Sequence, residues 1–184
     1  MKKGRLFIIS APSGAGKSTV IEEMRKRVPE LAFSISYTTR PKRAGETDGV
    51  DYIFVDKSKF DEMIRNDEFV EWAHVHDHLY GTLKRQLEEM MQKGRDVLLD
   101  IDVQGGANIK RQFPDAISIF LLPPDMETLK RRLAGRGTDK EEEIELRLAN
   151  ARMEMKYRNR YDHNVINDTV GRASENIIRI MKDN

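Results

Sequence analysis

The chain has 184 residues, of which 39% are hydrophobic and 34% are charged. This length predicts one domain with small insertions, and the apolar content excludes a disordered chain. Lys and Arg total 32 and Asp and Glu total 31, so the net charge of +1 disfavours a global basic field that captures nucleic acid or membranes. No run approaches the ~18 apolar residues of a membrane span. The absence of cysteine excludes disulfides, thiol catalysis and cysteine-bound zinc, and it favours a cytoplasmic location.

The first thirty residues predict a strand, a turn and a helix. The apolar run 6–10 indicates a strand that is buried on both faces. A glycine-rich turn follows at 12–16. Apolar residues at helical spacing then predict a helix over 19–28, which Pro29 ends.

Residues 33–82 interrupt this order with short segments, which we interpret as an inserted mixed-β subdomain. The predicted elements are a strand at 33–37, a loop at 40–49, a strand at 52–55, a helix around 60–64 and an extended segment at 69–75. Phe54, Phe69 and Trp72 are expected in the core of this insertion. The histidines of H-V-H-D-H at 74–78 favour a polar hairpin over a metal site.

After residue 82 the alternation of helices and strands resumes. The predicted elements are a helix at 83–91 ended by Gly94, strands at 97–101 and 117–122, a charged helical segment at 125–160, a strand at 165–166 and a helix at 173–181. His163 and Asn164 interrupt the apolar run before Asn167, which predicts that the last strand is either weak or at an edge of the sheet. Strongly apolar strands separated by helices predict an α/β fold, with a parallel sheet covered by helices on both faces.

Residues 11–18 read A-P-S-G-A-G-K-S, which departs from the phosphate-loop pattern G-x-x-x-x-G-K-[ST] only at Ala11. Glycines can turn successive N–H groups inward, and the N-terminus of the following helix favours an anion. The predicted ATP-binding residues are Ser13, Gly14, Ala15, Gly16, Lys17, Ser18 and Thr19. Lys17 would bind the β- and γ-phosphates, and Ser18 would bind Mg²⁺ together with Asp100, which ends the run V-L-L-D. The alternatives are a glycine-rich turn with a surface lysine, and an Asp100 that caps the next turn.

Several further motifs follow in order: S-Y-T-T-R-P-K-R-A-G-E at 36–46, D-Y-I-F-V at 51–55, F-V-E-W at 69–72 and Y-G-T at 80–82. With the phosphate loop, they resemble the guanylate kinase family over nearly the whole chain. The resemblance implies a P-loop NTPase fold and phosphorylation of GMP and dGMP, with ATP as donor and Mg²⁺ as cofactor. It implies a core of residues 1–32, 83–124 and 161–184, a GMP-binding subdomain at 33–82 and a helical lid at 125–160.

The resemblance also assigns residues to GMP. Glu71 matches the carboxylate that accepts from N1–H and the N2 amine of guanine, where adenine would instead present an acceptor. The other matching positions are Ser36, Thr82 and Asp102 around the base, and Arg40, Arg43, Tyr52 and Tyr80 at the phosphate. Taken alone, the R-P-K-R stretch is more typical of a solvated basic loop or a nucleic-acid-binding patch.

Arginines of the predicted lid match family positions that contact phosphates. These are Arg132, Arg136 and Arg147, and Asn167 matches a position near the adenine. The predicted catalytic residues are Lys17, Arg43, Arg132 and Arg147. The expected reaction is in-line attack by a GMP phosphate oxygen on the γ-phosphorus of ATP, without a general base.

Two other interpretations compete with this one. The first is a P-loop kinase of another small acceptor, such as AMP, thymidylate or shikimate. The combination of Glu71, Ser36 and Thr82 argues for guanine and against it. A catalytically inactive guanylate-kinase-like interaction module would typically have a degraded phosphate loop, whereas Lys17 and Ser18 are present here. The expected partners are GMP or dGMP and ATP, without nucleic acid or membrane, and the expected state is a monomer or a homodimer.

Overall fold

The computed structural model describes residues 3–75, 77–135 and 141–184. The chain divides into two compact units. Unit 1 comprises Met1–Leu6 and Glu30–Ala116, and unit 2 comprises Phe7–Pro29 and Ile117–Asn184. The motifs assigned to GMP fall in unit 1, whereas the phosphate loop falls in unit 2.

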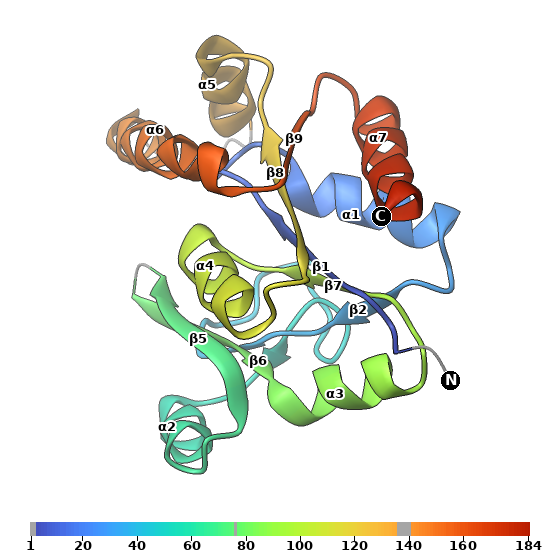
Figure 1. The fold of residues 1–184 in the computed structure, drawn as a ribbon. Coiled ribbons are helices and arrows are strands. Elements are labelled where there is room, and N and C mark those ends of the chain that lie inside the picture. Colours follow the sequence, from blue (N-terminus) through green and yellow to red (C-terminus); the bar gives the residue numbers. More distant parts are fainter. Residues whose placement is uncertain (1–2, 76, 136–140) are drawn as a thin grey trace. The chain divides into compact units, whose positions relative to one another are not determined.

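The larger sheet has five strands in the order β2-β7-β1-β8-β9 (Figure 1). Their bounds are β1 Leu6–Ser10, β2 Ala32–Ser34, β7 Val97–Asp100, β8 Ile117–Leu122 and β9 His163–Ile166. Within unit 1, β2 pairs with β7 in parallel, and within unit 2, β8 pairs in parallel with both β1 and β9. Every residue of β1 is buried, as its uninterrupted apolar run predicts. The predicted parallel sheet is therefore confirmed, and of the two expectations for the last strand, a weak strand or an edge strand, the structure shows an edge strand.

Helices of unit 2 pack in two pairs. Their bounds are α1 Lys17–Arg27, α5 Met126–Ala134, α6 Glu141–Glu154 and α7 Val170–Asp183, with a 3₁₀ helix at Met155–Arg160. Helices α1 and α7 lie side by side (Figure 1). Helices α5 and α6 pack through Leu129, Leu133, Leu148 and Ala151. The charged segment predicted as helical is thus two α-helices and a 3₁₀ turn in its described parts.

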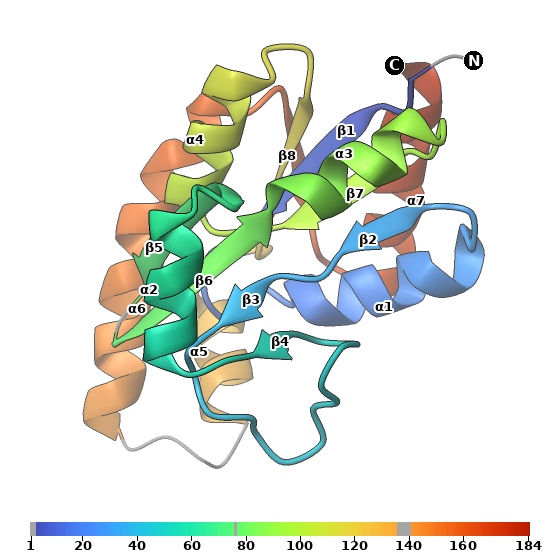
Figure 2. The same cartoon turned by 90° about the horizontal axis from the view of Figure 1, so that it is seen from below.

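The insertion of unit 1 forms a mixed four-stranded sheet in the order β4-β3-β6-β5 (Figure 2). Its strands are β3 Tyr37–Thr38, β4 Ile53–Phe54, β5 Phe69–Val75 and β6 His78–Leu83. Helix α2, Lys57–Arg65, packs on this sheet, because Phe60 and Met63 contact Phe69 and Leu79. The rings of Phe60 and Phe69 stack with centroids 4.5 Å apart. The predicted mixed-β insertion is confirmed.

Three local predictions are wrong. The single strand at 33–37 is two strands in two sheets, because the chain leaves the parallel pairing at Ser34 and enters the mixed sheet at Tyr37. Helix α4, Val103–Gln112, was not anticipated, since Gly105 and Gly106 lower helix propensity in its first turns. Trp72 is 44% exposed instead of buried, because side chains of a strand alternate between faces.

The remaining helix of unit 1 follows its prediction. Helix α3, Lys84–Gln92, buries Leu87 and Met91, and Gly94 beyond its end has a φ of 74°. This left-handed conformation explains why a glycine ends the helix. Within the described ranges, no helix is both long enough and apolar enough to cross a bilayer.

Candidate active site

The phosphate loop of unit 2 connects β1 to α1 with two glycines at positive φ. Gly14 has a φ of 87° and Gly16 a φ of 90°, a region that other residues rarely adopt. A Cβ at Gly14 would lie 2.7 Å from Leu133 Cδ2, and one at Gly16 would lie 2.5 Å from Asn167 Nδ2. Conformation and space therefore both require glycine at these positions.

Gly16 is also the N-cap of α1, which begins at Lys17. Because Gly16 has no side chain, no cap group covers the N-terminus of this helix. Ser18 and Thr19 follow in the first turn and are exposed. The start of α1 therefore presents the positive end of its dipole beside a lysine and two hydroxyls, an arrangement that favours a bound anion.

Ala15 joins the loop to two other predicted residues. Its carbonyl oxygen accepts hydrogen bonds from Asn167 Nδ2 at 2.7 Å and from Arg132 Nη1 at 3.2 Å. Arg132 Nη2 also donates to the Asn167 carbonyl oxygen at 2.9 Å. Asn167 is only 2% exposed, so it holds the loop from within the packed interior of unit 2. The structure thus brings Ala15, Arg132 and Asn167 together.

Ser13 connects the loop to α6. The Ser13 Oγ accepts from Arg147 Nη2 at 2.9 Å, and the Ser13 backbone N–H donates to Glu154 Oε2 at 3.1 Å. Arg147 was predicted at this site, but Glu154 was not. The only available signal was their spacing, because residues seven apart lie on the same face of a helix. The predicted Arg136 lies outside the described residues.

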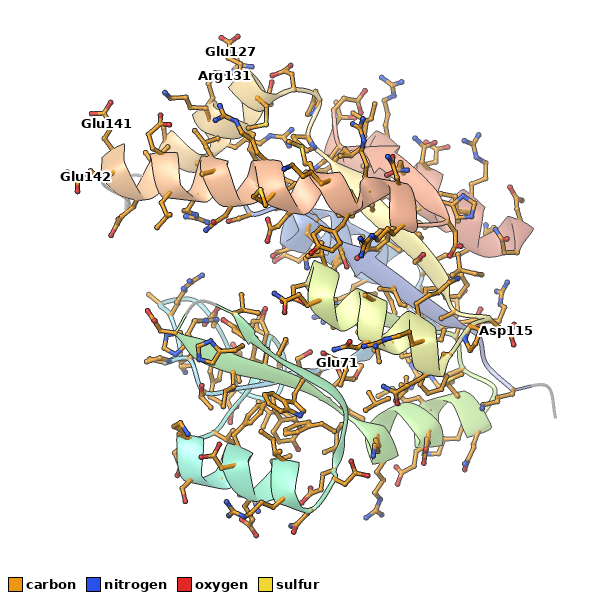
Figure 3. The ribbon with its side chains drawn as sticks, turned by 60° about the vertical axis from the view of Figure 1, so that its left-hand side comes forward. Glu71, Asp115, Glu127, Arg131, Glu141 and Glu142 are labelled. Atoms are coloured by element: carbon orange, nitrogen blue, oxygen red, sulfur yellow. The ribbon has the colours of Figure 1, made fainter. Side chains whose placement is uncertain are left out.

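In unit 1, the buried carboxylate of Glu71 lies between the mixed sheet and α4 (Figure 3). Glu71 is 7% exposed, and its Oε1 accepts from the Thr82 hydroxyl at 2.8 Å. Burial raises the pKa of Glu71 to about 7, with the Thr82 hydrogen bond opposing this shift and the charge of Asp102 adding to it. Glu71, Thr82 and Asp102 are therefore brought together, as predicted.

Gly105 was missed as a site residue. A Cβ at this position of α4 would lie 2.7 Å from Glu71 Oε2, so the absence of a side chain leaves room for the carboxylate. Asp102 caps the same helix, since its Oδ1 accepts from the Gly105 N–H at 2.7 Å. Asp102 therefore stabilises the N-terminus of α4, a role separate from the contact with the base that was predicted for it.

Two phenols stand beside a buried arginine. The rings of Tyr52 and Tyr80 meet edge to face with centroids 5.8 Å apart, and the guanidinium of Arg40 lies 5.4 Å from the centre of the Tyr52 ring. Burial raises the pKa of the Tyr52 hydroxyl, and the negative charge of Asp100 raises it further. The Tyr52 hydroxyl is therefore a hydrogen-bond donor at neutral pH. Ser36 is buried in the same unit.

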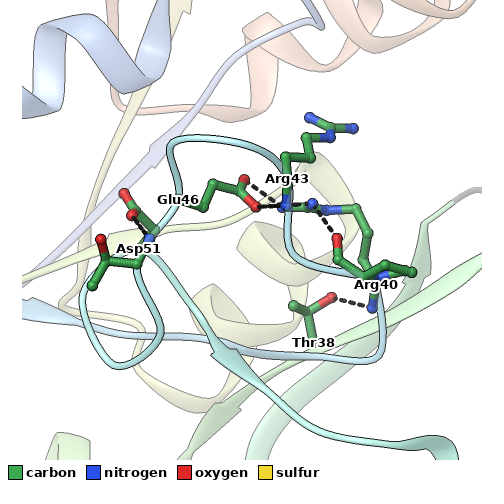
Figure 4. Close-up of polar contacts among 7 residues, drawn as sticks. Thr38, Arg40, Arg43, Glu46 and Asp51 are labelled. Carbon is green, nitrogen blue, oxygen red and sulfur yellow. Dashed lines mark hydrogen bonds and ion pairs between the residues drawn. The ribbon is translucent and has the colours of Figure 1, made fainter.

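An ion pair closes the loop that carries both predicted phosphate arginines (Figure 4). Arg40 Nη2 donates to Glu46 Oε1 at 2.6 Å, and Arg40 Nη1 donates to Glu46 Oε2 at 3.0 Å. The backbone N–H of Arg43 donates to the same Glu46 Oε2 at 2.8 Å. The Arg43 side chain is exposed and points away from Glu46. Glu46 was also missed, although it stands in the quoted motif.

Two of the three histidines at 74–78 lie in the part of the chain that the structure describes. No group of three His, Cys, Asp or Glu residues is placed there to hold a metal ion. His74 and His78 lie on the β5–β6 hairpin, where a polar hairpin was predicted, and His76 is outside the described ranges. Ser18 and Asp100, the residues predicted for Mg²⁺, offer a hydroxyl and a carboxylate, which are the oxygen donors that this ion prefers.

Comparison with known proteins gives one consistent result. The guanylate kinase family model matches residues 3–184. A guanylate kinase of Carboxydothermus hydrogenoformans is 45% identical over 181 residues, covering 98% of this chain and 89% of the relative. One of Syntrophotalea carbinolica is 50% identical over 174 residues, covering 95% and 83%. The crystal structure of guanylate kinase from Anaplasma phagocytophilum matches with a TM-score of 0.83 at 31% identity, covering 100% of this chain and 87% of that chain. The chain therefore belongs to the guanylate kinase family.

Proposed function

We propose that this chain is an ATP:GMP phosphotransferase that converts GMP and dGMP to their diphosphates and releases ADP. The observation that carries the proposal is the buried Glu71 carboxylate, which Thr82 orients in the unit that also holds Arg40 and the two phenols. Relatives that are named guanylate kinase, at 45% and 50% identity, support the same activity.

Guanine recognition rests on Glu71. The ionised carboxylate accepts hydrogen bonds from N1–H and the N2 amine, two adjacent donors that only guanine among the common bases presents in this way. Adenine would place an acceptor against the same lone pairs and leave a buried polar group unpaired. We assign Ser36 and Thr82 to the O6 side of the base and Asp102 to its border.

The GMP phosphate is assigned to Arg40, Arg43, Tyr52 and Tyr80. Guanidinium groups bind phosphate oxygens in a planar fork, and each charge-assisted hydrogen bond contributes about 1.5–3 kcal/mol. The buried Tyr52 hydroxyl keeps its proton at neutral pH and therefore donates to the phosphate. These groups recognise a phosphate dianion whichever base is attached to it.

The triphosphate of ATP is assigned to the phosphate loop. Backbone N–H groups of residues 13–19 surround the phosphates, and Lys17 neutralises charge on the β- and γ-phosphates. Arg132, Arg136 and Arg147 stabilise the charge that develops during transfer, and Asn167 lies near the adenine. A GMP phosphate oxygen forms a bond to the γ-phosphorus while the bond to the ADP oxygen breaks. The nucleophile is already an anion at neutral pH, so no general base is required.

Mg²⁺ and the cellular context complete the proposal. Ser18 and Asp100 are the residues that we assign to Mg²⁺, which, when bound, neutralises charge on the β- and γ-phosphates. The protein acts in the cytoplasm, as a monomer or a homodimer, on free nucleotides and without a nucleic-acid or membrane partner.

A coupled ADP-release assay with ATP and Mg²⁺ tests this function. GMP, dGMP, AMP, CMP, UMP and dTMP are supplied separately. Turnover with GMP and dGMP alone supports the assignment, whereas turnover with another acceptor contradicts the guanine pocket. GMP binding without turnover would identify an interaction module instead.

The raised pKa of Glu71 predicts an acid-sensitive KM for GMP. Below a pKa of about 7 the free carboxyl group is protonated, so GMP must bind at the cost of releasing that proton. KM for GMP is expected to rise as pH falls from 7.5 to 5.5, approaching tenfold per unit, and to level off above pH 7.5. The phosphate of GMP titrates near pH 6 and adds a second slope. In Glu71→Gln, KM for GMP should keep the pH dependence that comes from the phosphate and lose the part that comes from the carboxyl group. A pH profile of KM that this substitution leaves unchanged would contradict the prediction.

A further inference from the structure

Glu46 occupies the centre of the loop that carries both phosphate arginines. One carboxylate accepts from both terminal nitrogens of Arg40 and from the backbone N–H of Arg43 (Figure 4). Arg40 is only 8% exposed, and its Nη1 also donates to the Pro41 carbonyl oxygen at 2.8 Å. Burial opposes ionisation of Glu46, but the Arg40 and Arg43 donors bring the pKa of its carboxyl group below the usual value. The pair is therefore ionised at neutral pH.

Two roles are compatible with a carboxylate on a substrate-binding arginine. Glu46 could be a counter-ion that imitates the phosphate and leaves when GMP arrives, or a fixed support that remains. The geometry favours the support, because departure would break three hydrogen bonds at once. The Glu46 backbone N–H also donates to the Arg43 carbonyl oxygen at 3.2 Å, and this turn keeps the carboxylate close to its partners.

The hydrogen bonds to Glu46 and Pro41 use only part of the Arg40 guanidinium. They use Nη1 twice and Nη2 once, whereas the group carries five N–H donors. Tyr80 also hydrogen-bonds the Arg40 side chain, so the guanidinium and this phenol form one cluster of donors that suits the oxygens of a phosphate. The guanidinium also lies 5.4 Å and 5.7 Å from the ring centres of Tyr52 and Phe54, so its plane is fixed on more than one side.

We propose that Glu46 is a positioning residue, which stays in place during binding and holds Arg40 and the Arg43 backbone so that both guanidinium groups address the GMP phosphate. This inference rests on the proposed function, in which Arg40 and Arg43 bind that phosphate. A fixed support increases affinity because the loop is already ordered before the substrate arrives.

Glu46→Gln tests the proposal, because the two candidate roles predict opposite signs. Glutamine has nearly the same size but presents one acceptor and one donor, so it cannot hold both terminal nitrogens of Arg40. The support role predicts that KM for GMP rises about tenfold, whereas KM for ATP stays within twofold. The counter-ion role predicts a lower KM for GMP, since a competing anion has been removed. A lowered or unchanged KM for GMP therefore overturns the proposal.

Further variants separate this effect from misfolding and from failure of the proposed function. Glu88→Gln removes the same charge from an exposed position of α3 and should leave both KM values unchanged. Glu46→Asp keeps the charge and should recover part of the lost affinity, and thermal melts identify any unfolded variant. If the parent chain phosphorylates a different nucleoside monophosphate, the proposed function fails. The comparison of KM between the parent and Glu46→Gln is then repeated with that monophosphate, because it carries the same phosphate group as GMP. If the parent chain turns over none, calorimetric titration of GMP gives the same comparison as Kd.

Discussion

Replacing Glu71 by glutamine is expected to lower kcat/KM for GMP by about 10²-fold and to leave KM for ATP within twofold. Glutamine presents an NH₂ group where guanine also presents a donor, so one hydrogen bond is lost and two donors face each other. A buried, charge-assisted hydrogen bond contributes about 1.5–3 kcal/mol, which corresponds to 10- to 150-fold. Steady-state kinetics with each nucleotide varied in turn measures both parameters.

Stability gives an independent control for this variant. The pKa of Glu71 in the folded chain, about 7, lies above the ordinary value of 4.5 for a glutamate. Ionisation of this carboxyl group therefore destabilises the folded chain as pH rises through that window. A neutral glutamine avoids this cost, and the melting temperature of Glu71→Gln at pH 8 should not fall below that of the parent. Thr82→Val, which removes the hydroxyl that orients the carboxylate, should reduce GMP use by a smaller factor. Unchanged GMP kinetics in a folded Glu71→Gln protein would contradict the base assignment.

Gly16→Ala is expected to lower kcat/KM for ATP by about 10²-fold. Alanine at a φ of 90° carries a strain of about 1–2 kcal/mol, and its Cβ would lie 2.5 Å from Asn167 Nδ2. Asn167 cannot retreat without breaking its 2.7 Å hydrogen bond to Ala15, which costs about 1 kcal/mol more. The displaced loop loses the geometry that surrounds the phosphates.

Gly49→Ala is the matched control for Gly16→Ala. Gly49 also has a positive φ, of 75°, but its Cβ would meet nothing within 4 Å, so this change introduces strain without a clash. It lies in unit 1 and should leave KM for ATP unchanged. Calorimetric titration of GMP alone should give the same Kd for Gly16→Ala and the parent. A Gly16→Ala protein with normal ATP kinetics would show that the loop does not need this conformation.

Local signals predicted much of this structure. The phosphate loop and the weak or edge character of β9 both follow from residues within a few positions of each other, such as Gly14 and Gly16 or His163 and Asn164. The division between β2 and β3 does not, because an alternating apolar pattern says nothing about which sheet each residue joins. Helix α4 was missed because its glycines obscured a helix that Asp102 caps and tertiary packing stabilises.

The missed site residues have a common physical reason. Gly105 matters because Glu71, far away in the sequence, needs the space that a Cβ would fill. Glu154 matters because Ser13 lies against it. Glu46 was missed for a different reason. An acidic residue in a basic loop is ordinarily solvent-exposed, and only the structure shows that its carboxylate accepts three hydrogen bonds. Each role depends on a partner that periodicity does not identify.

The way the phosphate loop is held has a consequence for the order of events during synthesis. Its supports are Arg132, Arg147, Glu154 and Asn167, which follow their loop partners by 117 to 152 positions. At about 5–20 residues per second, a ribosome needs several seconds to add those positions. The loop is made among the first residues but gains its supports among the last, whereas residues 30–116 of unit 1 form an uninterrupted segment. A nascent chain is therefore expected to assemble most of unit 1 first and to complete the support of its phosphate loop only as translation nears its end.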